Sequence, residues 1–190
     1  MLQTLIDSGR EAQRTGAWDE ALAHYESALA LLAEGGDPKQ QADLHRWIGT
    51  VSTERGNLEQ ARQSFQRSLE LAEAAGLPEV QGSALVALAS VELLRGSLEG
   101  AADLYLHARE VADGVGNERL VAMIATNLGV IANIQGNVAV ALLSYRSSLE
   151  RYRRLGDEFS ASKALNNMGM AHVDLAEWEA AEACFGEAGE

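Results

Sequence analysis

Hydrophobic residues recur along this chain every three to four positions, with polar residues between them. Ala21, Tyr25 and Ala28 illustrate the spacing, which is i, i+4, i+7. This period places apolar side chains on one face of an α-helix, whereas a half-buried strand would alternate apolar and polar residues. The pattern therefore predicts an all-α protein. The expected helices cover residues 2–14, 18–34, 39–54, 58–75, 79–94, 98–115, 119–134, 138–155, 159–174 and 178–188.

The helical pattern itself repeats every 40 residues. The stretch RGNLEQARQSF, from Arg55 to Phe65, has counterparts that begin at Thr15, Arg95, Gln135 and Leu175. The second residue of each stretch marks a turn and is, in chain order, Gly16, Gly56, Gly96, Gly136 and Ala176. Self-similarity at a fixed period is the sequence signature of a stacked repeat architecture.

A second series of glycines lies 20 residues out of phase with the first and consists of Gly36, Gly76, Gly116 and Gly156. A glycine just past a helix end readily adopts the left-handed conformation that other residues resist. Asp37, Asn117 and Asp157 follow such glycines and are predicted to cap the next helix, and Pro38 suits a first helical turn. Two turn signals per 40 residues predict two helices per repeat.

Small and aromatic residues occupy fixed places in every repeat. Alanine follows the first turn at Ala21, Ala61, Ala101, Ala141 and Ala181. An aromatic residue comes four positions later, at Tyr25, Phe65, Tyr105, Tyr145 and Phe185. Further small residues stand at Ala28, Ser68, Ala108, Ser148 and Ala188, and seven positions before the turn at Gly9, Gly49, Ala89, Gly129 and Gly169. We expect the small residues to permit close helix approach and the aromatic residues to fill the hole between neighbouring repeats.

This arrangement resembles the tetratricopeptide repeat, in which a small residue in the first helix is followed by alanine, an aromatic residue and alanine in the second. The resemblance covers the whole chain and implies a right-handed α–α superhelix, a solenoid of helix–turn–helix repeats. HEAT and armadillo repeats are also about 40 residues long, but they lack the alanine–aromatic–alanine spacing. Long repeats containing ATNLGV and ALNNMG are similar to those of kinesin light chains and of bacterial regulators with helical sensor domains.

Two features depart from the usual tetratricopeptide pattern. The repeat is longer than the usual length of about 34 residues. The early tryptophan of the first helix is replaced by Leu5, His45, Leu85, Ala125 and Leu165. We expect one domain over residues 1–190, divided into repeats 1–38, 39–78, 79–118, 119–158 and 159–190, the last incomplete. Since solenoids need capped ends, we expect this chain to be a fragment of a larger bacterial protein or to pair with another chain.

Composition narrows the classes of partner. The chain of 190 residues carries a formal net charge of −13, which disfavours binding to the phosphates of nucleic acids. It contains no apolar run long enough for a membrane helix and no signal-like N-terminus. One cysteine, Cys184, excludes an internal disulfide and fits a reducing compartment. We therefore predict a cytoplasmic protein with no nucleic-acid or membrane partner.

A binding site is expected on the concave face, which the first helix of each repeat lines. Asn127, Asn133, Asn166 and Asn167 are predicted to hydrogen-bond the backbone of a bound peptide, because an amide both donates and accepts. Trp47 and Met123 would form apolar pockets, and Arg46 and Lys163 would meet a carboxylate. In the competing interpretation the asparagines bond between adjacent helices and Trp47 packs between repeats.

Catalysis is not expected. The histidines His24, His45, His107 and His172 lack metal-ligand spacing, and Cys184 has no evident basic partner. No phosphate-binding loop occurs, and no cofactor or metal is predicted. The sequence favours a protein–protein interaction module that serves as a scaffold or sensor in signalling. Two alternatives stay open, namely a small-ligand-sensing regulatory domain and a self-association domain that forms a homodimer through the uncapped fifth repeat.

Overall fold

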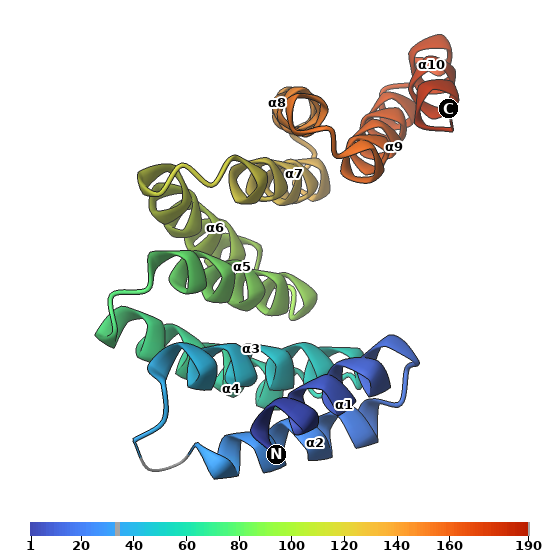
Figure 1. The fold of residues 1–190 in the computed structure, drawn as a ribbon. Helices are drawn as coiled ribbons and strands as arrows, with labels where there is room; N and C mark the ends of the chain where they lie inside the picture. The colour runs from blue at the N-terminus through green and yellow to red at the C-terminus, as the bar shows by residue number, and fades with distance from the viewer. Residues whose placement is uncertain (33–34, 190) are drawn as a thin grey trace. The chain divides into compact units, whose positions relative to one another are not determined.

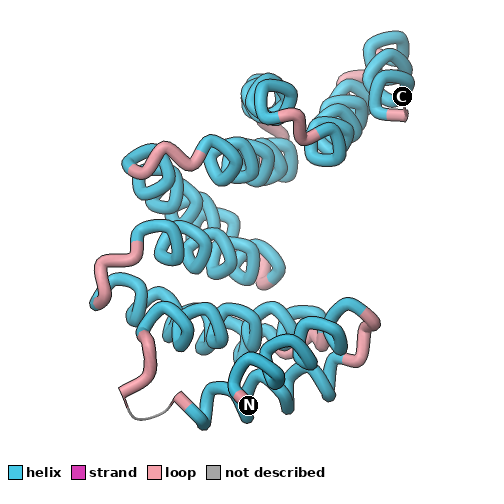
Figure 2. The backbone as a smooth tube through the Cα atoms, in the orientation of Figure 1, coloured by secondary structure: helices cyan, strands magenta, loops and turns pink. Residues whose placement is uncertain are grey.

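A computed structural model describes residues 1–32 and 35–189. These residues form ten α-helices and no strand. The helices are α1 (Leu2–Arg14), α2 (Trp18–Leu31), α3 (Pro38–Glu54), α4 (Leu58–Ala74), α5 (Pro78–Leu94), α6 (Leu98–Gly114), α7 (Glu118–Ile134), α8 (Val138–Leu155), α9 (Glu158–Asp174) and α10 (Trp178–Ala188), shown in Figures 1 and 2. The all-α prediction is confirmed. The predicted extension of the second helix to residue 34 lies outside the described residues.

The chain divides into two compact halves, Met1–Leu104 and Tyr105–Glu190, with the boundary inside α6. In the N-terminal half, α1 packs on α2, α2 on α3, α3 on α4 and α4 on α5. In the C-terminal half, α7 packs on α8, α8 on α9 and α9 on α10. The first helices of successive repeats also touch, since α3 contacts α5 and α7 contacts α9. Each first helix therefore has one side that the second helix of its own repeat does not cover.

The tight turn within each repeat depends on one left-handed residue. Between α7 and α8, Gly136 has φ +80°, and the N–H of Asn137 reaches back to the carbonyl of Ala132 at 2.8 Å. This geometry closes the end of a helix by satisfying carbonyls that would lack partners. In the fifth repeat the position belongs to Ala176, whose φ of +58° is positive although it has a Cβ atom.

The links between repeats follow the second glycine series with one exception. Gly76, Gly116 and Gly156 have positive φ, as expected. In the first link the residue with positive φ is Gly35, at +80°, and the prediction for Gly36 was wrong. The first link also differs in its length, because α2 ends at Leu31, three residues earlier in its repeat than α4 does in the next.

Side-chain caps begin several of the helices. Asp37 accepts a hydrogen bond from the backbone N–H of Lys39, and Pro38 is the first residue of α3. Asn117 and Asp157 cap α7 and α9 in the same way. These predictions are confirmed. Asn57, which the sequence reasoning did not single out, caps α4 through the N–H of Gln60 at 3.2 Å.

The small and aromatic positions meet in the core of each repeat. A Cβ atom on Gly9 would lie 2.5 Å from Cε1 of Tyr25, and one on Gly49 would lie 2.6 Å from Cε1 of Phe65. The aromatic ring thus packs against the glycine of its own repeat. Tyr25 also reaches the next repeat, because its ring centroid is 5.5 Å from that of Trp47. Among the described residues, no helix is both long enough and apolar enough to cross a bilayer.

Candidate functional site

The free side of α7 and α9 carries most of the residues predicted to bind a peptide. Because α7 and α9 contact each other, their outer side chains form one surface within the C-terminal half. Residues spaced i, i+4, i+7 line one side of a helix. We define the α7/α9 face by Met123, Asn127, Val130 and Ile134 on α7 and by Lys163, Asn166, Asn167 and Met170 on α9.

A hydrogen bond between the two helices fixes their register. Asn133 Nδ2 donates to Asp174 Oδ2 at 2.9 Å, so residues 41 positions apart lie together. Asn127 and Asn167 are 40 positions apart and therefore stand at corresponding heights on α7 and α9. The repeat period thus places the two asparagines at equivalent positions of two helices that contact each other.

Three amides of the α7/α9 face make no side-chain hydrogen bond within residues 1–32 and 35–189. The side chains of Asn127 and Asn167 are half-buried, and that of Asn166 is exposed. None of the three forms a side-chain hydrogen bond with the residues that the structure describes. Each amide offers an oxygen acceptor and two N–H donors. A half-buried amide without a partner gains by meeting a ligand that supplies one.

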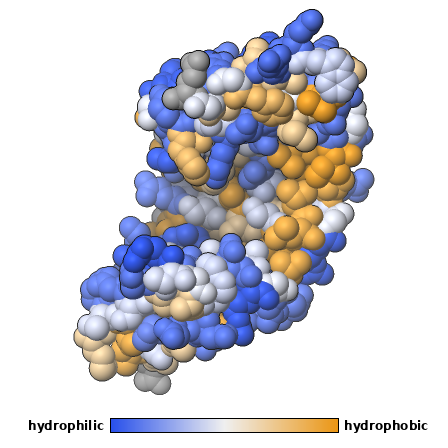
Figure 3. All heavy atoms as spheres, turned by 90° about the vertical axis from the view of Figure 1, so that its right-hand side faces the viewer, coloured by the Kyte–Doolittle hydropathy of each residue, from blue (hydrophilic) through white to orange (hydrophobic). Residues whose placement is uncertain are grey.

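Apolar side chains flank these amides. Met123, Ile134 and Met170 are 38%, 58% and 55% exposed, which is high for large hydrophobic residues. Figure 3 shows, from one side of the molecule, that hydrophobic residues reach the surface among hydrophilic ones. The α7/α9 face therefore combines hydrogen-bonding groups with uncovered apolar area, a combination typical of interaction surfaces.

Met123 also borders a depression of about 340 Å³ at the start of α7 and α9. Leu120, Tyr152 and Phe159 line it as well, and Phe159 is 72% exposed. Lys163 Nζ lies 4.3 Å from the centre of the Phe159 ring, a cation–π contact that orients both side chains. Lys163 therefore has a contact within the protein and forms no close ion pair with the described residues, although its charge helps to lower the pKa of the Asp157 carboxyl.

Asn133 is occupied. Its bond to Asp174 joins α7 to α9, as the competing interpretation of the sequence expected for asparagines. The nearby Tyr145 is buried, and burial together with the Asp174 carboxylate raises its pKa to about 12. Asn133 thus serves the contact between repeats.

Arg46 and Trp47 lie on α3 in the N-terminal half and are also engaged there. The Trp47 ring packs between Tyr25 and the guanidinium of Arg10, whose Cζ is 4.6 Å from the ring centre. Arg46 Nη2 lies 3.2 Å from Asp43 Oδ1. Trp47 therefore packs between the first two repeats, the role that the sequence left open for it, and Arg46 pairs within its own helix.

The structure thus brings together Met123, Asn127, Lys163, Asn166 and Asn167 on one face, while Arg46 and Trp47 belong to the other half. A single groove running through both halves stays a prediction.

Sequence reasoning missed Phe159. Its signal was available, because the corresponding positions in the earlier repeats are charged, namely Lys39, Glu79 and Arg119.

Titratable groups elsewhere are held in structural contacts. His172 Nδ1 lies 2.7 Å from Glu177 Oε2, a contact that spans the turn after α9. Burial raises the pKa of the Cys184 thiol, against the opposing effect of Arg146, so the reactive thiolate is disfavoured. Within residues 1–32 and 35–189, no group of three or more His, Cys, Asp or Glu side chains could hold a metal ion.

Comparison with protein families gives a match that rests on the repeats themselves. The family model described as Tetratricopeptide repeat matches residues 1–74 and 40–114. The chain belongs to the tetratricopeptide repeat family. This confirms the resemblance inferred from the spacing of glycine, alanine and aromatic residues. No curated protein matches this member of the family.

Solved structures share the fold of this tetratricopeptide repeat chain. BtubC (BKLC) from P. vanneervenii is 22% identical, with a TM-score of 0.82 over 95% of this chain and 75% of that one. The Rap conjugation gene regulator of plasmid pLS20, in complex with the Phr* peptide, is 16% identical, with a TM-score of 0.84. The match covers 98% of this chain, which spans 52% of the Rap regulator. TPR-like repeats of a Podosopora anserina kinesin light chain are 12% identical, with a TM-score of 0.77 over 98% of this chain and 92% of that one. These similarities confirm the predicted helical solenoid fold.

Proposed function

We propose that this chain is a non-catalytic protein-interaction module that binds a peptide segment along the α7/α9 face. One observation carries the proposal. Asn127 and Asn167 occupy equivalent positions on the contacting helices α7 and α9, make no side-chain hydrogen bond in the described part of the chain, and share these helices with the exposed Met123 and Met170. This arrangement matches the needs of an extended peptide, whose backbone presents alternating donors and acceptors.

Two kinds of group on the α7/α9 face contact the peptide in different ways. The amides of Asn127, Asn166 and Asn167 bond the peptide backbone and do not select its sequence. Met123 and Met170 contact apolar side chains of the peptide, and flexible methionine side chains adapt to different shapes. Lys163 forms no close ion pair with the described residues and favours an acidic group on the peptide.

Family membership supports the proposal. The Rap regulator, which shares the fold, has been solved in complex with a peptide. The net charge of −13 makes nucleic acid an unfavourable alternative partner. Residence in the cytoplasm and a role as the scaffold or sensor part of a bacterial signalling protein belong to the same proposal.

The test is a capture experiment with matched variants. The intact chain selects peptides from a random peptide library, and the affinity of the best binder is measured by fluorescence polarisation. Replacing Asn127 and Asn167 with alanine should weaken binding about tenfold or more, since two hydrogen bonds are lost. The control pair is Gln135→Ala with Asn137→Ala. Both residues are exposed in the α7–α8 turn, and Asn137 makes no cap hydrogen bond.

Equal binding by the asparagine variant and the control would remove this site from the proposal, provided that circular dichroism shows both variants folded. Self-association through the fifth repeat stays a prediction. Light scattering over a range of protein concentrations distinguishes it, because only a self-associating chain gains mass as its concentration rises.

A further inference from the structure

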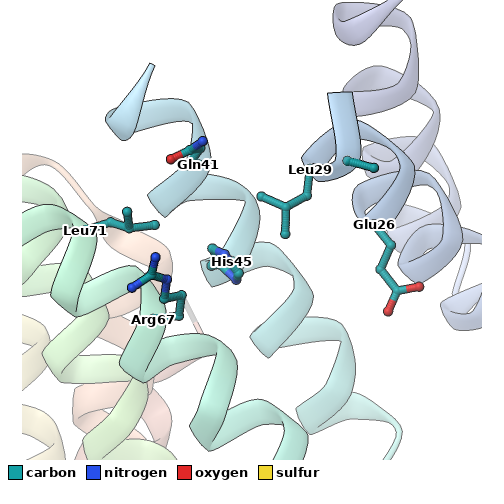
Figure 4. Close-up of a pocket in the computed structure, with 7 residues that line it drawn as sticks. Glu26, Leu29, Gln41, His45, Arg67 and Leu71 are labelled. Atoms are coloured by element: carbon teal, nitrogen blue, oxygen red, sulfur yellow. The ribbon is translucent and has the colours of Figure 1, made fainter. Parts of the chain in front are cut away.

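A second depression, of about 400 Å³, lies in the N-terminal half between α2, α3 and α4. Figure 4 shows His45 at its base, with Leu29 on the α2 side and Arg67 and Leu71 on the α4 side. The volume falls within the range of small-ligand sites. The lining residues are Glu26, Leu29, Ala30, Gln41, His45, Arg67 and Leu71, none of which belongs to the α7/α9 face.

Two residues that line this space differ from their counterparts in other repeats. His45 stands where the third and fifth repeats have Leu85 and Leu165, which are only 1% and 5% exposed. Ala30 stands where the later repeats all carry glutamate, namely Glu70, Glu110 and Glu150. A smaller residue on one wall and a polar residue at the base therefore replace the side chains that the repeat otherwise uses here.

His45 is half-buried and makes no hydrogen bond with the described residues. Burial lowers its pKa, and the Arg67 guanidinium lowers it further, against the opposing effect of Glu70. The imidazole is therefore neutral near pH 7 and offers one donor and one acceptor. A half-buried ring with unused hydrogen-bonding capacity in a ligand-sized depression indicates a binding site.

The walls carry opposite charges. Arg67 on α4 is bound to Glu70 through Nη1 at 3.0 Å, which leaves its other nitrogens available. Glu26 on α2 forms no ion pair with the described residues, and its carboxylate points away from His45 in Figure 4. Gln41 Nε2 donates a hydrogen bond to the carbonyl oxygen of Leu32 at 2.7 Å, and the side-chain oxygen of Gln41 remains able to accept one. Between the two charges the walls are apolar, formed by Leu29, Ala30 and Leu71.

We propose that this depression binds a short zwitterionic peptide of two or three residues with aliphatic side chains. Arg67 holds the carboxylate of the ligand, Glu26 holds its ammonium group, and His45 bonds the peptide group between them. The aliphatic side chains lie against Leu29 and Leu71. A free amino acid carries both charges on one carbon, whereas a peptide of two or three residues separates them by about 7–10 Å and so suits charges held on two different helices.

The probe is leucyl-leucine, added to the intact chain while the imidazole signals of its four histidines are followed by NMR. We expect saturable shifts of the His45 signals and no shift of those from His107. Blocking the ammonium group as N-acetyl-leucyl-leucine, or the carboxylate as leucyl-leucinamide, should weaken binding about threefold to fivefold, as expected for exposed ion pairs.

Two variants replace a lining residue with its counterpart from another repeat. Ala30→Glu should abolish binding, measured by calorimetry, because the longer side chain fills the depression, and His45→Leu should abolish it because the group that bonds the peptide is lost. Glu26→Gln should remove only the preference for a free ammonium group. The proposal is overturned if leucyl-leucine at millimolar concentration does not shift the His45 signals. It is also overturned if Ala30→Glu and His45→Leu both bind leucyl-leucine as the natural chain does. Neither result bears on peptide binding at Asn127 and Asn167.

Discussion

Gly129 on α7 lies directly against the ring of Tyr145 on α8. A Cβ atom on Gly129 would be 2.6 Å from Cε1 of Tyr145, closer than any ordinary contact between carbon atoms. The same relationship links Gly169 to Phe185, at 2.5 Å. The two helices of a repeat therefore approach closely because one of them lacks a side chain where the other presents a ring.

Replacing Gly129 with alanine should lower the free energy of unfolding by about 1–3 kcal/mol, since the added methyl group overpacks the contact with Tyr145. Urea denaturation followed by circular dichroism measures the change. The control is Gly186→Ala, on α10 in the same half, where no atom lies within 4 Å of the added Cβ. That substitution should be neutral or stabilising, because alanine favours a helix over glycine. Equal effects at the two sites would contradict the packing argument.

Replacing Ala176 with glycine should stabilise the protein by about 1 kcal/mol. Ala176 has φ +58°, a conformation in which its Cβ is crowded and which glycine adopts without strain. Thermal unfolding is the measurement, and the melting temperature should rise. The reverse change, Gly136→Ala, should lower it, since Gly136 has φ +80° in the corresponding turn. A fall in melting temperature for Ala176→Gly would show that the turn tolerates alanine.

Arg10 and Trp47 should be coupled in stability. The guanidinium carbon of Arg10 lies 4.6 Å from the centre of the Trp47 ring. Arg10→Met should lower the free energy of unfolding by about 0.5–1 kcal/mol through loss of the cation–π contact. In a Trp47→Leu background the same change should cost nothing, and a double-mutant cycle measures the difference. An unchanged cost in that background would mean that Arg10 acts through another contact.

His45 should make stability depend on pH below about 6.5. Its pKa in the folded protein is lowered, chiefly by burial, so the unfolded chain binds the proton more tightly. This contribution to stability is complete above the ordinary histidine pKa of about 6.5 and is lost as pH falls towards the lowered value. His45→Leu removes the effect. Urea midpoints of the variant should therefore fall less than those of the natural chain over this range, and parallel midpoints would refute the assignment.

The local features of this protein were determined by its sequence, because each depends on a few neighbouring residues. The 40-residue period, the turn at Gly136 and the caps at Asp37, Asn117 and Asp157 follow from backbone conformation and from hydrogen bonds over two or three residues. The pairing of small and aromatic positions was equally visible, since a fixed repeat brings the same residues together each time. Even Phe159 could have been found, because it stands where the earlier repeats carry charges.

Only the tertiary structure decided which of the predicted site residues are free. From residue type, Asn127 and Asn133 were equally good candidates for binding a peptide. Asn133 is hydrogen-bonded to Asp174, 41 residues away, while Asn127 makes no side-chain hydrogen bond in the described chain. Trp47 was assigned to a ligand pocket, but Tyr25 and Arg10 cover its ring. The physical reason is that a side chain's availability depends on which distant groups reach it. That is set by the packing of one repeat on the next, and residue type alone does not record it.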